Sequence, residues 1–86
     1  MKTLIISILF SLLFLQQTSI AAEMPPQNAK LLSEIVRTLE EQGYNPIVDI
    51  EFDDDRWEIE AYKEGVKREL RVEPVSGKII SDRKDN

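Results

Sequence analysis

The sequence predicts an α+β domain in which one N-terminal amphipathic helix packs on a three- to four-stranded antiparallel sheet. Apolar residues recur at helical spacing between residues 31 and 39. Between residues 47 and 72, apolar and charged residues instead alternate with a period of two, which is typical of strands with one buried face. Short turn sequences follow the alternating runs: Asp53–Asp55, Glu64-Gly65 and Pro74–Gly77. A helix that covers one face of a sheet is a common two-layer arrangement for a small domain.

Residues 1–22 have the layout of a secretory signal peptide. A positively charged start precedes the apolar run Leu4–Leu15, and the small residues Ser19 and Ala21 suit signal peptidase. We expect cleavage after Ala21 or Ala22. The alternative, a spanning membrane anchor, needs about 20 apolar residues, and this run is shorter. No cysteine follows it, so a lipoprotein anchor is not expected either. The protein is therefore predicted to be periplasmic or secreted, with no stable membrane anchor after cleavage.

Removal of the signal peptide leaves one small, acidic domain without disulfides. A chain this short buries only about 60% of its unfolded surface, so its core is thin. The full chain has no cysteine and a formal net charge of −5, and the loss of Lys2 with the signal peptide makes the remainder more acidic. Such a domain repels nucleic acid and anionic lipid, so we expect neither as a partner. The sign of the charge favours a basic protein partner or a divalent cation.

The helix is predicted from about Gln27 to Gln42. Residues 23–27 are expected to form a flexible segment ahead of it, because two prolines there oppose an earlier helix start. Asn28 is a predicted N-cap, and Gly43 is well placed to end the helix. Leu31 is expected to widen an apolar stripe whose members are spaced as on one helix face. That stripe contains Leu32, Ile35, Val36 and Leu39.

Four extended segments are predicted after a loop at residues 44–46. They cover residues 47–52, 56–63, 66–73 and 78–81. The polar tail, residues 82–86, is expected to fray. The folded domain is thus predicted to span residues 28–81.

The register of the sheet is predicted by keeping apolar residues on one face across both hairpins. In this register, Phe52 pairs with Trp57 in the first hairpin, and Trp57 pairs with Val72 in the second. The resulting apolar face contains Val48, Ile50, Phe52, Trp57, Ile59, Ala61, Leu70 and Val72. The helix stripe has a suitable size to cover it.

The opposite face of the sheet is predicted to be acidic. We define the acidic face as Asp49, Glu51, Glu58, Glu60 and Glu69. Three like-charged pairs lie directly opposite one another in this register, and each destabilises the fold by about a few tenths of a kcal/mol. The candidate partner-binding residues are Asp49, Glu51, Glu58, Glu60 and Tyr62. The alternative for the carboxylates is a solvated surface that keeps the protein soluble, and for Tyr62 it is packing on Lys67.

The residue types present argue against catalysis. Nucleophilic catalysis lacks its usual base because there is no histidine, and the absence of cysteine and histidine also excludes the usual zinc ligands. Asp53–Asp55 is interpreted as a hairpin tip, because a calcium loop needs alternating ligands, a glycine and a distant glutamate. We predict no enzymatic activity, no catalytic residue, no metal-binding residue and no cofactor. The alternative that stays open is an acidic module that binds a divalent cation.

The order of these elements resembles that of the PepSY domain family of exported bacterial proteins. The shared features are a helix that ends in Gly43-Tyr44, the alternating strands, the turn glycine Gly65, and a final turn followed by Lys78–Ile80. In that family the third strand usually ends in Asp-Pro-x-x-Gly. Here the turn reads Glu73-Pro74-Val75-Ser76-Gly77, which preserves the proline and the glycine.

The resemblance implies a regulatory or protein-binding module. PepSY domains occur beside proteases, where inhibition has been proposed, and in sensor proteins outside the cytoplasm. The family has no catalytic residues, so the resemblance implies none here. It implies an extracytoplasmic protein partner, such as a protease or a sensor.

Overall fold

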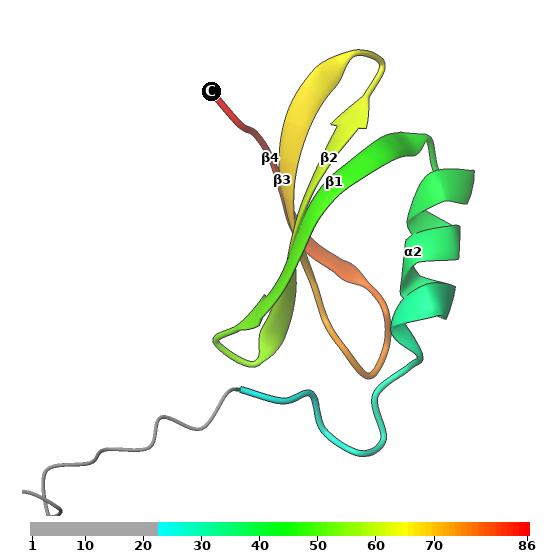
Figure 1. Ribbon diagram of the computed structural model, residues 1–86, viewed down its shortest axis with the longest axis vertical. Helices are drawn as coiled ribbons and strands as arrows, with labels where there is room; N and C mark the ends of the chain where they lie inside the picture. Colours follow the sequence, from blue (N-terminus) through cyan, green and yellow to red (C-terminus); the bar gives the residue numbers. More distant parts are fainter. Residues whose placement is uncertain (1–22) are drawn as a thin grey trace, which may run out of the picture.

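A computed structural model describes residues 23–86, in which one helix packs on a four-stranded antiparallel sheet. Helix α2 covers Leu32–Glu41. The strands are β1 (Tyr44–Asp53), β2 (Arg56–Lys63), β3 (Val66–Val72) and β4 (Ile79–Lys84), and they are neighbours in that order. Figure 1 shows α2 running alongside one face of the sheet. The predicted α+β architecture is confirmed for these residues. The predicted signal peptide and its cleavage after Ala21 or Ala22 lie outside the described residues.

Helix α2 begins later than predicted. Leu31 is its N-cap residue and no side chain caps it, so the prediction that Asn28 is the N-cap is wrong. Residues 27 and 28 instead form a turn, in which the Ala29 N–H donates to the Pro26 carbonyl at 3.0 Å. The Lys30 N–H donates across to the Pro74 carbonyl at 2.9 Å. The backbone ahead of the helix is thus attached to the turn between β3 and β4.

The helix buries a narrower stripe than predicted. Ile35 and Leu39 are each only 2% exposed, whereas Leu31 is 67% exposed and lies outside the stripe. The helix ends as predicted, because Gly43 follows it with a φ of +97°, in the left-handed region that glycine accepts without strain. The buried residues of helix and sheet form one core: Ile35, Leu39, Tyr44, Ile59, Ala61, Leu70 and Val72.

The register of β1 and β2 is as predicted at the hairpin tip and differs at the start of β1. Phe52 pairs with Trp57, and their rings meet edge to face with centroids 5.1 Å apart. The register shifts between Ile47 and Asp49, so that Ile47 instead of Val48 lies opposite Ala61. Val48 is 50% exposed, and the prediction that it joins the apolar face is wrong. The irregularity turns one residue outward without disturbing the pairs beyond it.

The second hairpin pairs as predicted, with Trp57 opposite Val72. The last strand is longer than predicted, because β4 continues to Lys84 instead of ending at Ser81. Residue Asp82 pairs with Leu70, and the Asp85 N–H still donates to the Lys67 carbonyl at 2.9 Å. The prediction that residues 82–86 fray is therefore wrong. Backbone pairing to β3 orders this polar segment.

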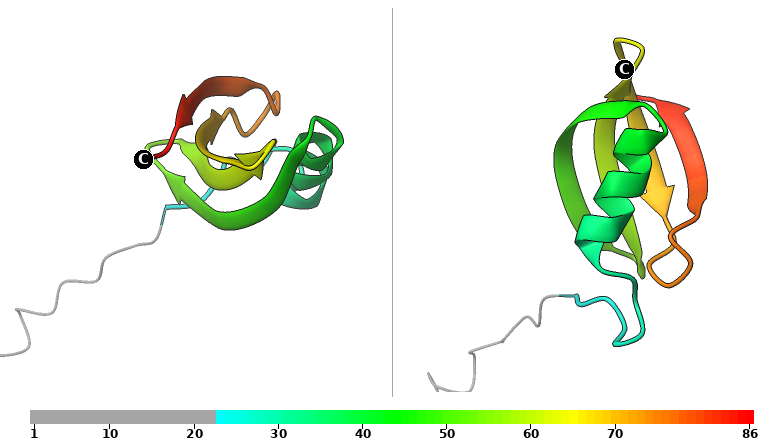
Figure 2. Two further views of the ribbon diagram at one scale, coloured as in Figure 1. Left: turned by 90° about the horizontal axis from the view of Figure 1, so that it is seen from above. Right: turned by 90° about the vertical axis from the view of Figure 1, so that its right-hand side faces the viewer.

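The sheet is strongly curved, as the view from above in Figure 2 shows. Its concave side holds α2 and the core, since the buried residues of β2 and β3 alternate with the acidic ones. The acidic face therefore occupies the convex side. The curvature brings the start of β1 and the end of β4 toward each other across the concave side.

Candidate partner-binding face

Three strands contribute carboxylates to the acidic face. Asp49 and Glu51 come from β1, Glu58 and Glu60 from β2, and Glu69 from β3. The predicted like-charged pairs are all present: Glu51 lies opposite Glu58, and Glu60 lies between Asp49 and Glu69. This arrangement follows directly from the alternation of apolar and acidic residues along the strands.

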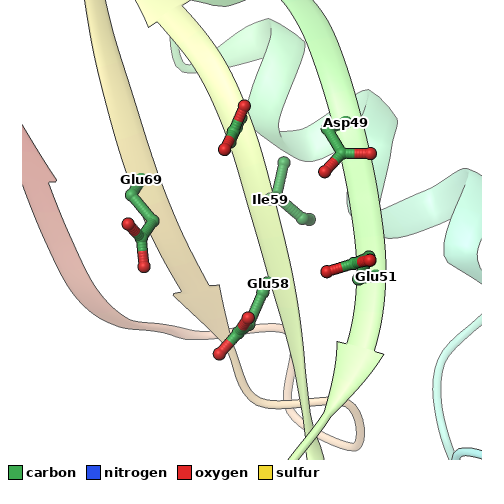
Figure 3. Close-up of a pocket in the computed structure, with 6 residues that line it drawn as sticks. Asp49, Glu51, Glu58, Ile59 and Glu69 are labelled. Carbon is green, nitrogen blue, oxygen red and sulfur yellow. The ribbon is translucent and has the colours of Figure 1, made fainter. Parts of the chain in front are cut away.

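The carboxylates surround a shallow hollow of about 150 Å³. It is lined by Asp49, Glu51, Glu58, Glu60 and Glu69, together with Ile59. Figure 3 shows the carboxylates of Asp49 and Glu51 along β1, with Glu58 and Glu69 on the neighbouring strands. Four of the five predicted partner-binding residues therefore meet at one place. Glu69 is a member of the hollow that was not among those candidates.

The carboxylates of the face differ in their ion pairing. Glu58 lies 3.8 Å from the Arg71 guanidinium, Glu60 lies 3.4 Å from the Lys67 ammonium, and Glu69 lies 3.1 Å from the Arg83 guanidinium. The pKa of Lys67 is raised, chiefly by the charge of Glu60 and its hydrogen bond, and also by Asp85.

Asp49 and Glu51 are exposed, and within residues 23–86 neither forms an ion pair. The uncompensated negative charge of the face is therefore concentrated on β1. Like charges placed opposite each other destabilise a sheet, so these two side chains do not contribute to folding through charge.

Tyr62 lies outside the hollow. It pairs with Lys67 as predicted and is half-buried, one step further along β2 than Glu60 on the same side of the strand. The structure therefore does not bring Tyr62 together with the other four candidates around one hollow.

The described residues offer no arrangement suited to a metal ion. Within residues 23–86, no group of three or more acidic, histidine or cysteine side chains is placed to hold one. At the hairpin tip, Asp54 and Asp55 both have positive φ angles, of 54° and 62°, which is the backbone of a tight two-residue turn. The Asp54 N–H is bonded to the Glu23 carboxylate at 2.9 Å, and Arg56 pairs with Asp54 at 3.5 Å.

A comparison with known families agrees with this fold. The sequence profile described as the peptidase propeptide and YPEB domain matches residues 5–83. This chain belongs to the PepSY family. The resemblance seen in the sequence is confirmed. Domains of the PepSY family are propeptide- and inhibitor-like regulators associated with peptidases. No curated protein and no solved structure gave a significant match.

Members of the PepSY family are typically extracellular or periplasmic. Among residues 23–86, the one helix is too short and too polar to cross a membrane.

Proposed function

We propose that this PepSY domain is an exported, non-enzymatic module that binds and modulates an extracytoplasmic protein, such as a protease or a sensor. The observation that carries the proposal is the family match over residues 5–83, since that family is defined by a peptidase propeptide domain. Propeptide- and inhibitor-like domains act by contact with a partner, and they need no reactive group of their own.

The proposed contact surface is the acidic face, with Asp49, Glu51, Glu58, Glu60 and the neighbouring Tyr62 as its candidate residues. The proposal rests mainly on Asp49 and Glu51, because both are exposed and neither forms an ion pair within the described part of the chain. A basic patch on a partner would relieve the repulsion between these carboxylates on binding. Complementary charge of this kind accelerates association at low salt and selects partners of the right sign.

Affinity capture from the extracytoplasmic fraction tests this assignment. The bait is the purified protein, compared with the variant Asp49→Lys/Glu51→Lys. The control is Glu40→Lys/Glu41→Lys, which makes the same change in charge at exposed positions of α2. We expect the acidic-face variant to lose the captured partner at low salt, while the control retains it. Equal capture by both variants would show that the face has been assigned wrongly.

The alternative function is binding of a divalent cation by the same carboxylates. The hollow gathers five of them, which is the observation in its favour, although no three of them are placed to hold one ion in the described part of the chain. Calcium that binds only the folded protein must raise its melting temperature. A melting curve in millimolar calcium that shows no shift relative to a calcium-free sample would remove this alternative.

A further inference from the structure

A second hollow lies on the helix side of the molecule, away from the acidic face. It has a volume of about 310 Å³ and is formed where the middle of α2 meets the turn between β3 and β4. The helix side provides Glu34, Arg37 and Thr38, and the turn provides Ser76 and Gly77. Lys30, from the segment ahead of the helix, completes the wall. We call this hollow the helix–turn groove.

One backbone hydrogen bond and one close packing contact join the two sides of the helix–turn groove. The Lys30 N–H donates to the Pro74 carbonyl at 2.9 Å, which attaches the segment ahead of α2 to the turn. The stem of Lys30 passes over Gly77, so that a Cβ atom at Gly77 would lie 3.1 Å from the Lys30 Cδ atom. Glycine at this position therefore lets the lysine stem and the turn approach closely.

The cations of the groove lack the ion pairs that most cations of the sheet have. Arg56, Lys67, Arg68, Arg71 and Arg83 each lie within 4.0 Å of a carboxylate, whereas Lys63 and Lys84 have no such pair within residues 23–86. Within residues 23–86, the side chains of Lys30 and Arg37 have neither an ion pair nor a hydrogen bond, although both are exposed beside Glu34. Two positive charges thus face one hollow of an otherwise acidic domain.

The turn supplies neither a free side-chain donor nor a set of free backbone N–H groups to the groove. The N–H groups of Ser76, Gly77 and Lys78 already donate to the Glu73 carboxylate, the Glu73 carbonyl and the Ser76 hydroxyl oxygen, respectively. A phosphate site of the usual kind is built from free backbone N–H groups, so this turn does not suit one. The Ser76 hydroxyl oxygen accepts the Lys78 N–H. The pKa of Glu73 is lowered by hydrogen bonds from the Ser76 N–H and from the Ser76 hydroxyl, so the hydroxyl proton is already used within the turn.

The helix side supplies acceptors. The Thr38 hydroxyl donates to the Glu34 carbonyl at 2.9 Å, so its oxygen can accept a further bond. The Glu34 carboxylate accepts as well. The groove therefore combines two cations, which suit a carboxylate, with acceptors that suit the N–H groups of a peptide backbone.

We infer that the helix–turn groove binds an extended segment of another protein through one aspartate or glutamate side chain. The carboxylate is held by Lys30 and Arg37, while Thr38 and Glu34 accept backbone N–H groups of the segment. The two cations and the Glu34 carboxylate together leave one net positive charge, which matches a single acidic side chain of the bound segment. This site is separate from the acidic face, which takes a partner surface of opposite sign.

Titration followed by amide NMR shifts tests the inference. The probe is the peptide acetyl-Ala-Ala-Glu-Ala-Ala-amide, added at low salt to the purified protein. We expect saturable shifts at the amides of Ser76, Gly77 and Lys30. A probe with glutamine in place of glutamate should bind about tenfold more weakly, because the charge-assisted bonds are lost. The variant Lys30→Gln/Arg37→Gln should weaken binding of the glutamate probe at least as much.

The control Lys84→Gln removes an exposed cation of β4 and should leave the affinity unchanged. Equal binding of the glutamate and glutamine probes, or of the double variant and the wild type, would overturn the inference. The same holds if the glutamate probe does not bind, or if only the free acid acetyl-Ala-Ala-Ala binds, because the ligand would then be a chain terminus. Shifts that appear in the groove on concentrating the protein alone would assign it to a second copy of the chain, which also overturns the inference.

Discussion

The hydroxyl of Tyr44 donates a hydrogen bond to the carboxylate of Asp82, with 2.6 Å between the two oxygens. Tyr44 opens β1 and Asp82 lies in β4, so the bond joins the two outermost strands of the sheet. Arg68 donates from its Nε to the other oxygen of Asp82 at 2.7 Å, and the Lys63 ammonium lies 4.5 Å from the centre of the Tyr44 ring. The curvature seen in Figure 2 makes this contact possible. A polar link thus closes one end of the concave side above the core.

Replacement of Tyr44 by phenylalanine removes the link and keeps the ring. Tyr44 is only 4% exposed, and a hydrogen bond to a charged acceptor in such a place stabilises by about 1–2 kcal/mol. We expect Tyr44→Phe to lower the free energy of unfolding by that amount, as measured by urea denaturation. Tyr62→Phe is the matched control, because the Tyr62 hydroxyl has no hydrogen bond to any described residue. An equal change in both variants would contradict the role given to the Tyr44–Asp82 bond.

The same link predicts how stability changes at alkaline pH. Burial, followed by the hydrogen bond to Asp82 and its charge, raises the pKa of Tyr44 from 10.0 to about 12. Because the pKa is higher in the folded state, the contribution of Tyr44 is complete below pH 10 and is lost as the pH rises toward 12. Denaturation curves at several pH values should show this loss in the wild type. If Tyr44→Phe loses just as much stability over that range, the account of the link is wrong.

The ionisation of Asp82 should make stability depend on pH at the acidic end of the range. Burial opposes its ionisation, but the hydrogen bonds from Tyr44 and Arg68 and the charge of Arg68 outweigh it and lower the pKa of Asp82 below 3.8. Its contribution to stability is therefore present above pH 3.8 and is lost as the pH falls through the lower folded-state pKa. The difference in unfolding free energy between the wild type and Asp82→Asn should shrink over this interval. A difference that stays constant with pH would indicate that Asp82 acts only through its shape.

The packing of the core predicts that shortening a buried side chain of α2 lowers the stability of the protein strongly. Leu39 is 2% exposed and contacts the sheet, so Leu39→Ala should lower the unfolding free energy by about 2–5 kcal/mol. Leu31→Ala is the control, because Leu31 is 67% exposed and should tolerate the change with little effect. Thermal denaturation followed by circular dichroism measures both. A comparable loss of stability in the two variants would show that Leu31 also packs against the sheet, which would contradict this account.

The central register of the sheet could be predicted from the sequence because the side-chain period of a strand is two. Once Phe52 lies opposite Trp57, the pairs of the hairpin follow as far as Asp49 opposite Glu60. The register shift between Ile47 and Asp49 could not be predicted in this way, because Val48 continues the apolar alternation without a break. Only Pro46, which suits an edge strand, hints at an irregularity there.

Contacts between distant segments could not be predicted from the sequence pattern. Tyr44 stands in a predicted loop and Asp82 in a predicted tail, and nothing local in either segment shows that they meet. For the acidic face, the like-charged pairs followed from the register, but the ion pair of Glu69 with Arg83 depends on the unpredicted length of β4. The helix–turn groove depends likewise on the bond between Lys30 and Pro74.

The central claim is that the acidic face serves a partner and not the fold, and one variant tests it most directly. Asp49→Lys/Glu51→Lys replaces two repulsive cross-strand pairs by attractive ones, so it should raise the unfolding free energy by about 0.2–1 kcal/mol for each pair. The decisive measurement is the affinity of the captured partner for this variant at low salt. We predict that the affinity falls by at least about tenfold in a protein that is as stable as the wild type or more so. An unchanged affinity would contradict the claim.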